Sequence, residues 1–200
     1  MRIAGKKIPA KACFALLLAL SMLIGQWMTA PPVRGATEAL IVYDDALSPE
    51  FVSYGWARTE LASTEEVRSG SAAIKLDPDG GSALYFFKGM IMSAAEYGTL
   101  KFWIHGGSAG GQKLKLVLSL SSQPVGERYV DELVPGGVEA GKWKEVTVKL
   151  SDLGVSGIID GIWLWGEGGD QEPVYVDDMA FLPADATETP TEEEPEGELV

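Results

Sequence analysis

Hydrophobic and polar residues alternate in many short stretches between residues 39 and 182. In the segment KLKLVLSL (113–120) a leucine occupies every second position, and the same period of two recurs at 100–105 and 145–150. Because successive side chains of a β-strand point to opposite faces, this period predicts strands with one buried face. Less regular apolar runs predict further strands at 39–43, 55–62, 71–77, 82–88, 127–134, 159–165 and 173–182.

Glycine-rich segments separate these predicted strands, and they suit turns because glycine readily adopts positive φ. They read DPDGG (77–81), GGSAGG (106–111), PGG (135–137) and GEGG (166–169), and we expect GGSAGG to form a hairpin turn. No segment shows a convincing helical period, although residues 93–98 suit a single helical turn. About ten strands without helices predict an all-β, two-sheet antiparallel β-sandwich (jelly roll), with a closed barrel as the alternative.

The first residues have the layout of a secretory signal peptide. Residues 1–12 carry four bases and no acid, and an apolar run interrupted only by Ser21 follows from Cys13 to Ile24. This layout predicts a secreted, extracellular protein. We assign residues 1–36 to the signal peptide, with cleavage somewhere between 30 and 39. The alternative is an uncleaved anchor, although the run is shorter than the roughly 20 residues that span a bilayer.

The last residues differ in kind from the rest. Residues 184–200 read ADATETPTEEEPEGELV, with seven acids and no base. Such a composition buries too little apolar surface to offset the entropy of ordering, so we predict a disordered acidic tail. The predicted β-sandwich domain therefore spans residues 37–183.

Charge narrows the possible partners. Of the 16 lysines and arginines, five precede residue 37, which leaves 11 bases against 29 acids and a net charge of −18 for the mature chain. A phosphate backbone would be repelled, so we expect no nucleic acid partner and, after signal cleavage, no membrane partner. Neutral glycans and cations suit this charge, and we expect a monomer.

Four stretches in order along the chain resemble the galactose-binding-like jelly-roll carbohydrate-binding modules of bacterial extracellular proteins. They are IVYDDAL (41–47), VRSGSAAIKLD (67–77), GKWKEVTVKLSDLG (141–154) and VYVDDMAFL (174–182). The resemblance implies a sandwich that binds extracellular polysaccharide. It leaves the ligand undetermined, because sandwiches of this shape carry many functions.

The resemblance also implies a structural calcium ion at the edge where the first and last strands meet. Acidic pairs occur in both of these strands, at 44–45 and 177–178. Calcium takes six to eight oxygen ligands and tolerates irregular geometry. Alternation turns the two members of each pair to opposite faces, and we favour Asp45 and Asp178 as the metal ligands. The alternative is an acidic sheet edge that discourages pairing with other chains.

Large aromatic residues are the candidate ligand-binding residues. If Phe102, Ile104, Ile162 and Leu164 are core, then Trp103, His105, Trp163 and Trp165 share one outer sheet surface, which Tyr85 extends and Trp56 borders. An exposed aromatic surface suits the apolar faces of sugar rings, and nearby polar groups bind their hydroxyls. Candidates for the polar role follow the Trp163–Trp165 segment: Gln171 and Asp170, with Glu167 and Arg128 besides. The alternative is that these tryptophans pack in the core.

Nothing in the sequence indicates a specific reaction. His105 is the sole histidine, no nucleophile-elbow motif accompanies it, and zinc ligands and a phosphate-binding glycine loop are missing from the sequence. We therefore expect a non-catalytic binding module. Two alternatives stay open. One is a polysaccharide lyase or glycoside hydrolase that uses a pair of the 29 acids. The other is a cell-surface module whose aromatic patch meets a protein.

Overall fold

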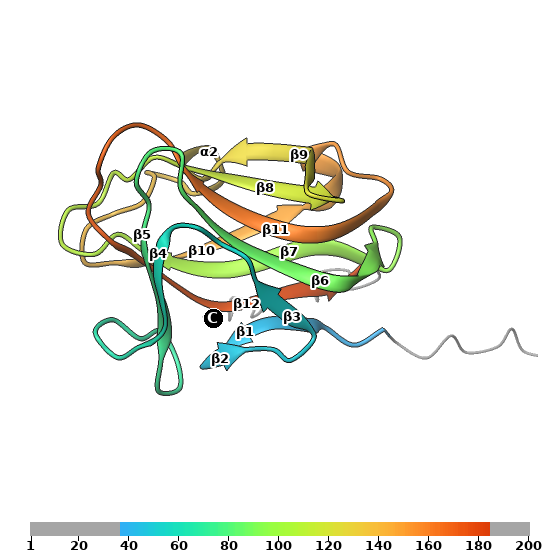
Figure 1. Cartoon of the computed structure of the whole chain (residues 1–200), viewed down its shortest axis with the longest axis horizontal. Helices are drawn as coiled ribbons and strands as arrows, with labels where there is room; N and C mark the ends of the chain where they lie inside the picture. Colours follow the sequence, from blue (N-terminus) through green and yellow to red (C-terminus); the bar gives the residue numbers. More distant parts are fainter. Residues whose placement is uncertain (1–36, 185–200) are drawn as a thin grey trace, which may run out of the picture. The chain divides into compact units, whose positions relative to one another are not determined.

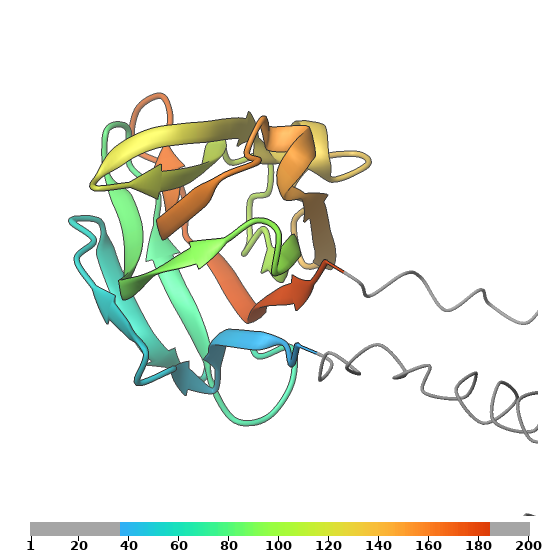
Figure 2. The same ribbon diagram turned by 90° about the vertical axis from the view of Figure 1, so that its right-hand side faces the viewer.

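Two antiparallel β-sheets pack face to face in the computed structural model, which describes residues 37–184 (Figures 1 and 2). This arrangement confirms the all-β sandwich. The signal peptide predicted at residues 1–36 and the tail predicted at residues 184–200 lie outside the described residues, apart from Ala184. None of the helices in the described part has the length and apolarity needed to cross a membrane.

Seven strands make up the first sheet, in the order β10–β7–β12–β1–β2, with β5 pairing with β12 and β4 pairing with β5. Their bounds are β1 (Leu40–Asp44), β2 (Ala46–Leu47), β4 (Arg58–Ser63), β5 (Ala73–Asp77), β7 (Tyr97–His105), β10 (Trp143–Lys149) and β12 (Val174–Pro183).

Five strands make up the second sheet, in the order β3–β6–β11–β8–β9. Their bounds are β3 (Phe51–Ser53), β6 (Ala83–Ser93), β8 (Leu114–Leu120), β9 (Gln123–Tyr129) and β11 (Ile158–Gly166). A short helix, α2 (Val130–Leu133), follows β9, and a 3₁₀ turn, η1 (Leu150–Leu153), follows β10.

The core lies between the sheets and uses the predicted inward faces. Phe102 and Ile104 of β7 and Leu116 and Leu118 of β8 are fully buried, as is Val146 of β10. The short strands β2 and β3 were not predicted, and two further segments differ from prediction. The strand predicted at 127–134 ends at Tyr129 because the chain turns into α2, where acids in the first turn favour the helix dipole.

The segment GGSAGG is not a hairpin turn. It links β7 to β8, and these strands belong to different sheets, so it carries the chain from one layer to the other. This crossing divides the predicted site between the sheets. Trp103 and His105 lie in one sheet, and Trp163 and Trp165 lie in the other.

The last strand, β12, changes partner in the middle. Its residues Val174–Val176 pair with β5, and its residues Met179–Phe181 pair with β1, on the same edge. The register on the opposite edge shifts between Asp177 and Ala180. Asp178 has φ 50°, a positive value that a non-glycine residue adopts only with support from its surroundings. The second acidic pair therefore marks the point where β12 changes partner.

Candidate functional site

The outer face of the five-stranded sheet carries a continuous aromatic surface. In register, Trp163 of β11 lies opposite Tyr85 of β6, and Gly161 lies opposite Phe87. Side chains two apart on a strand share a face, so Tyr85 and Phe87 lie beside Trp163 and Trp165. We call this surface the aromatic platform; it consists of Tyr54, Trp56, Tyr85, Phe87, Trp163 and Trp165.

The rings of the platform contact one another. Trp163 and Trp165 are stacked at 6.3 Å between centroids, with an interplanar angle of 25°. Tyr85 meets Trp163 edge-on at 5.2 Å, and Trp56 meets Trp165 edge-on at 5.7 Å. Edge-to-face and offset arrangements are the favourable geometries for aromatic pairs. The rings therefore support each other as one surface.

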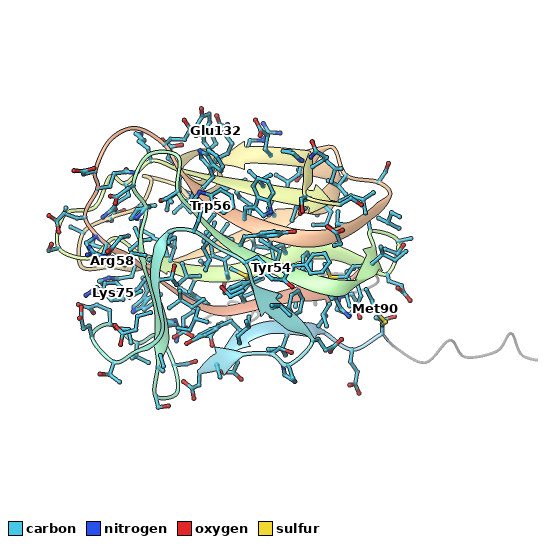
Figure 3. All side chains as sticks on the ribbon, viewed as in Figure 1. Tyr54, Trp56, Arg58, Lys75, Met90 and Glu132 are labelled. Carbon is cyan, nitrogen blue, oxygen red and sulfur yellow. The ribbon has the colours of Figure 1, made fainter. Side chains whose placement is uncertain are left out.

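The most exposed rings come from the segment that follows β3. Tyr54 is 58% exposed and Trp56 is 52% exposed, and Figure 3 labels both side chains. Their backbone N–H groups donate to carbonyl oxygens of β6, that of Tyr54 to Tyr85 and that of Trp56 to Ala83, both at 2.9 Å. Gly55 permits this approach, because a Cβ there would lie 2.7 Å from the Ala83 oxygen.

A shallow apolar groove of about 360 Å³ lies on the platform. It is lined by Tyr54, Trp56, Tyr85, Phe87, Ser122 and Trp163. The indole Nε1–H of Trp56 is occupied, donating to the Gly81 carbonyl oxygen at 2.8 Å, which holds this exposed ring in place. The buried indole Nε1 of Trp163 has no hydrogen-bond partner among the described residues.

Charged residues border the platform on the side of β8 and β9. Lys115 lies between Glu127 and Glu167, with its Nζ 3.3 Å and 3.2 Å from their carboxylate oxygens. The same Nζ lies 5.2 Å from the ring centroid of Tyr129. Hydrogen bonding to Glu167, and less to Glu127, raises the pKa of Lys115 above its ordinary value, so this lysine stays charged at neutral pH.

Trp103 and His105 do not belong to this surface, so the prediction of four large rings on one face is wrong. Both lie in β7 of the seven-stranded sheet. The Arg68 guanidinium covers the Trp103 ring at 4.1 Å. His105 is 3% exposed, and its Nδ1 accepts the N–H of Gly107 at 3.1 Å. Alternation turned both pairs away from the core, but the two outer faces belong to different sheets, and His105 is covered on its own face.

Gln171 holds the loops at one end of the sandwich. Its Oε1 accepts the N–H of Lys113 at 2.6 Å, and its Nε2 donates to the carbonyl oxygens of Pro78 and Glu167. These contacts occupy the amide that we expected to bind sugar hydroxyls. Asp170 is exposed beside it.

The other polar candidates are also engaged with protein groups. Arg128 donates to the Asp152 carbonyl oxygen at 2.6 Å, and Glu167 pairs with Lys115.

The predicted metal ligands contact one short loop. Asp45 Oδ1 accepts the N–H groups of Ser71 and Ala72 at 2.6 and 2.9 Å, which lowers the pKa of Asp45 below its ordinary value. Asp178 Oδ1 accepts the hydroxyl of Ser69 at 2.7 Å. A Cβ on Gly70 would lie 2.3 Å from both carboxylate oxygens of Asp45, so only glycine fits there.

Asp177, the neighbour of Asp178, holds the start of the same loop. It is fully buried and accepts the N–H groups of Arg68 and Ser69 at 3.0 and 3.3 Å. Burial raises its pKa above the ordinary value, against the opposing effect of these hydrogen bonds. Oxygen donors of this kind suit a hard cation. In the described part of the chain, however, no three His, Cys, Asp or Glu side chains are grouped to hold a metal ion.

Two platform residues, Tyr54 and Phe87, are missing from the sequence prediction. The signal for Tyr54 is its spacing from Trp56, because the triplet Tyr54–Gly55–Trp56 places both rings on one side of an extended chain. Phe87 has the same relation to Tyr85. These pairs lie beside Trp163 because β3, β6 and β11 are neighbours in the sheet, and the order of the strands cannot be deduced from the spacing of the residues.

Comparison with known proteins gives two kinds of relative. No family model matches the chain. An endoglucanase from Dictyostelium discoideum is 30% identical over 146 residues, which cover 71% of this chain and 21% of the endoglucanase. The chain thus spans about a fifth of the length of this curated relative.

Solved structures share the fold. A variant of a family 29 carbohydrate-binding module complexed with mannohexaose has a TM-score of 0.50 and 13% identity, covering 72% of this chain and 89% of that one. A second variant, complexed with cellulohexaose, gives the same four values. A third variant of a family 29 module has a TM-score of 0.51. The chain is therefore a β-sandwich with the fold of these modules, and one of its outer sheet faces is aromatic.

Proposed function

We propose that this protein binds extracellular polysaccharide on the aromatic platform and does not cleave it. The observation that carries the proposal is the pair of exposed rings, Tyr54 and Trp56, held against Tyr85, Trp163 and Trp165. Exposed aromatic rings gathered on one sheet face are typical of a binding site. A sugar ring presents an apolar C–H face that stacks on aromatic rings, and this surface offers several in contact.

The comparisons support a glycan ligand. The solved modules of the same fold include complexes with mannohexaose and cellulohexaose, and the 30% identical relative is an endoglucanase. Both oligosaccharides are uncharged. The surroundings of the platform suit such ligands, because Glu127 and Glu167, which border it, would repel an anionic polymer.

Binding without catalysis is supported by the state of the acids beside the platform. Glu127 and Glu167 both pair with Lys115. Glycoside cleavage commonly uses two acidic side chains that flank the scissile bond. The groove itself is lined by aromatic rings and Ser122.

A pull-down on insoluble glucan, xylan and mannan tests the proposal. We expect the full-length protein to bind at least one of them without releasing reducing sugar or unsaturated product. Release of product would favour a lyase or hydrolase. Failure to bind any polysaccharide would favour a module that meets a protein through the same patch.

Secretion, calcium binding and the monomeric state are part of the same proposal. Secretion would place the protein where polysaccharide lies, and N-terminal sequencing of protein from the medium would locate the cleavage site between 30 and 39. A calcium ion at Asp45 and Asp178 would hold β1 and β12 to the 68–72 loop, which both residues contact. Sedimentation of the purified chain tests the monomer.

A further inference from the structure

The turn between β8 and β9 contributes Ser122 to the lining of the groove, and with it a polar group beside the aromatic rings. Ser121 and Ser122 are the two turn residues, because Leu120 pairs with Gln123 across the hairpin. Both have positive φ, at 52° and 59°. A two-residue turn with these angles favours asparagine and glycine, so two serines in it need support from elsewhere.

Asp160 supplies that support. Its Oδ2 accepts the backbone N–H of Ser121 at 2.7 Å, and its Oδ1 lies 3.5 Å from the Ser119 hydroxyl. Asp160 is 7% exposed, and a buried carboxylate is costly unless such donors satisfy it.

A β-bulge aims this carboxylate at the turn. Ile159 and Ile162 both face the core although they are three residues apart, because the register of β11 against β6 shifts between Ile159 and Gly161. The extra residue takes Asp160 out of the inward alternation. Bulges commonly re-aim a side chain beside a functional site in this way.

The turn held by Asp160 places the hydroxyl of Ser122 at the groove, beside the phenol hydroxyl of Tyr85. Ser122 lines the groove, and its Oγ lies 3.5 Å from the Tyr85 phenol oxygen. That separation is longer than a strong O–H···O hydrogen bond, which measures about 2.5–3.0 Å. Tyr85 is 6% exposed overall, but it lines the groove, and each of the two hydroxyls keeps its capacity to donate and accept toward a third group.

We propose that Ser122 and Tyr85 form the polar part of the groove and bind a hydroxyl group, or two neighbouring hydroxyl groups, of a sugar ring stacked on the platform. Asp160 is the positioning residue that holds Ser122 there. This inference rests on the proposed function and adds which part of the platform reads the sugar's hydroxyls. Aromatic stacking alone accepts any ring with an apolar face, whereas a fixed pair of hydroxyls discriminates by the position of the partner group.

Calorimetric titration of the full-length protein with cellulohexaose and with mannohexaose tests the inference. We expect Ser122→Ala and Tyr85→Phe each to weaken binding of the preferred oligosaccharide by about three- to tenfold, the loss of one hydrogen bond. Ser121→Ala is the matched control: it lies in the same turn and keeps the N–H that Asp160 holds, so its affinity should stay within about twofold.

The positioning role has its own readout. Asp160→Ala should weaken binding, and adding Ser122→Ala to it should cause no further loss, because Asp160 acts through Ser122. Asp160→Asn, which keeps an acceptor oxygen, should restore part of the affinity and serves in place of Asp160→Ala if the latter fails to fold. If the native protein binds neither oligosaccharide nor any insoluble polysaccharide, the proposed function fails. Full affinity in Ser122→Ala and Tyr85→Phe, with the native protein binding, overturns this inference alone.

Discussion

The ring of Trp56 meets the ring of Trp163 edge-on, with 5.9 Å between centroids and an interplanar angle of 78°. Trp163 belongs to β11, in the middle of the five-stranded sheet, whereas Trp56 comes from the segment after β3 at its edge. The contact turns an exposed side chain into a fixed one, since the indole N–H of Trp56 is also bonded to Gly81. A rigid exposed ring loses little conformational entropy when a ligand stacks on it.

Replacing Trp56 should therefore remove much of the binding. We expect Trp56→Ala to weaken binding of the preferred polysaccharide by about tenfold or more, the usual effect of truncating a central aromatic contact. Affinity electrophoresis in gels that contain the soluble polysaccharide measures this.

The other face of the sandwich offers the control for that experiment. Trp103→Ala removes an indole of the same size from the seven-stranded sheet, where Arg68 covers it. We expect its migration in the polysaccharide gel to equal that of the native protein. A loss of binding in Trp103→Ala, with Trp56→Ala unaffected, would place the binding site on the seven-stranded sheet and contradict the proposal.

Gln171 should matter for stability and not for binding. Its side chain joins the backbones of Pro78, Lys113 and Glu167, so Gln171→Ala leaves several polar groups without partners, at about 1–3 kcal/mol for each one that is buried. Chemical denaturation should show a lower free energy of unfolding. Asp170→Ala, one residue away and exposed, should change it by less than about 0.5 kcal/mol. Equal effects of the two substitutions would contradict the bracing role of Gln171.

The pH dependence of stability should carry a contribution from Asp45. Its folded-state pKa lies below the ordinary value of 3.8 because it accepts the N–H groups of Ser71 and Ala72. The ionised form thus stabilises the fold fully above pH 3.8, and this stabilisation is lost as the pH falls through the lowered folded-state pKa. The native protein should exceed Asp45→Asn in melting temperature at neutral pH, and the gap should narrow below pH 3.8. A gap that is constant with pH would contradict this account.

Calcium should raise the melting temperature if Asp45 and Asp178 hold it. Binding to the folded state alone stabilises it by an amount that grows with the logarithm of calcium concentration. We expect differential scanning calorimetry to show a higher melting temperature in millimolar calcium than in a chelator. Asp45→Ala and Asp178→Ala should each abolish the difference. An identical melting temperature of the native protein in the two buffers would show that Asp45 and Asp178 hold the 68–72 loop by hydrogen bonds without calcium.

The alternating pattern of the sequence predicted most of the strands and, at β7 and β11, the two faces of the strand. At β7 it placed Phe102 and Ile104 inward and Trp103 outward, and at β11 it placed Ile162 and Leu164 inward and Trp163 outward. A period of two reports which side of a strand is apolar, because burial acts on each side chain locally.

Which outer faces coincide depends on how the strands pair in the folded chain. β7 and β11 carry similar patterns, yet the turn GGSAGG sends the chain to the other sheet, so Trp103 and Trp163 lie on different sheets. The register shifts at Asp160 and at Asp177–Asp178 likewise depend on strand pairing. Pairing joins residues far apart in sequence through backbone hydrogen bonds that are the same for every residue type. The side-chain pattern therefore carries almost no information about which strands are neighbours.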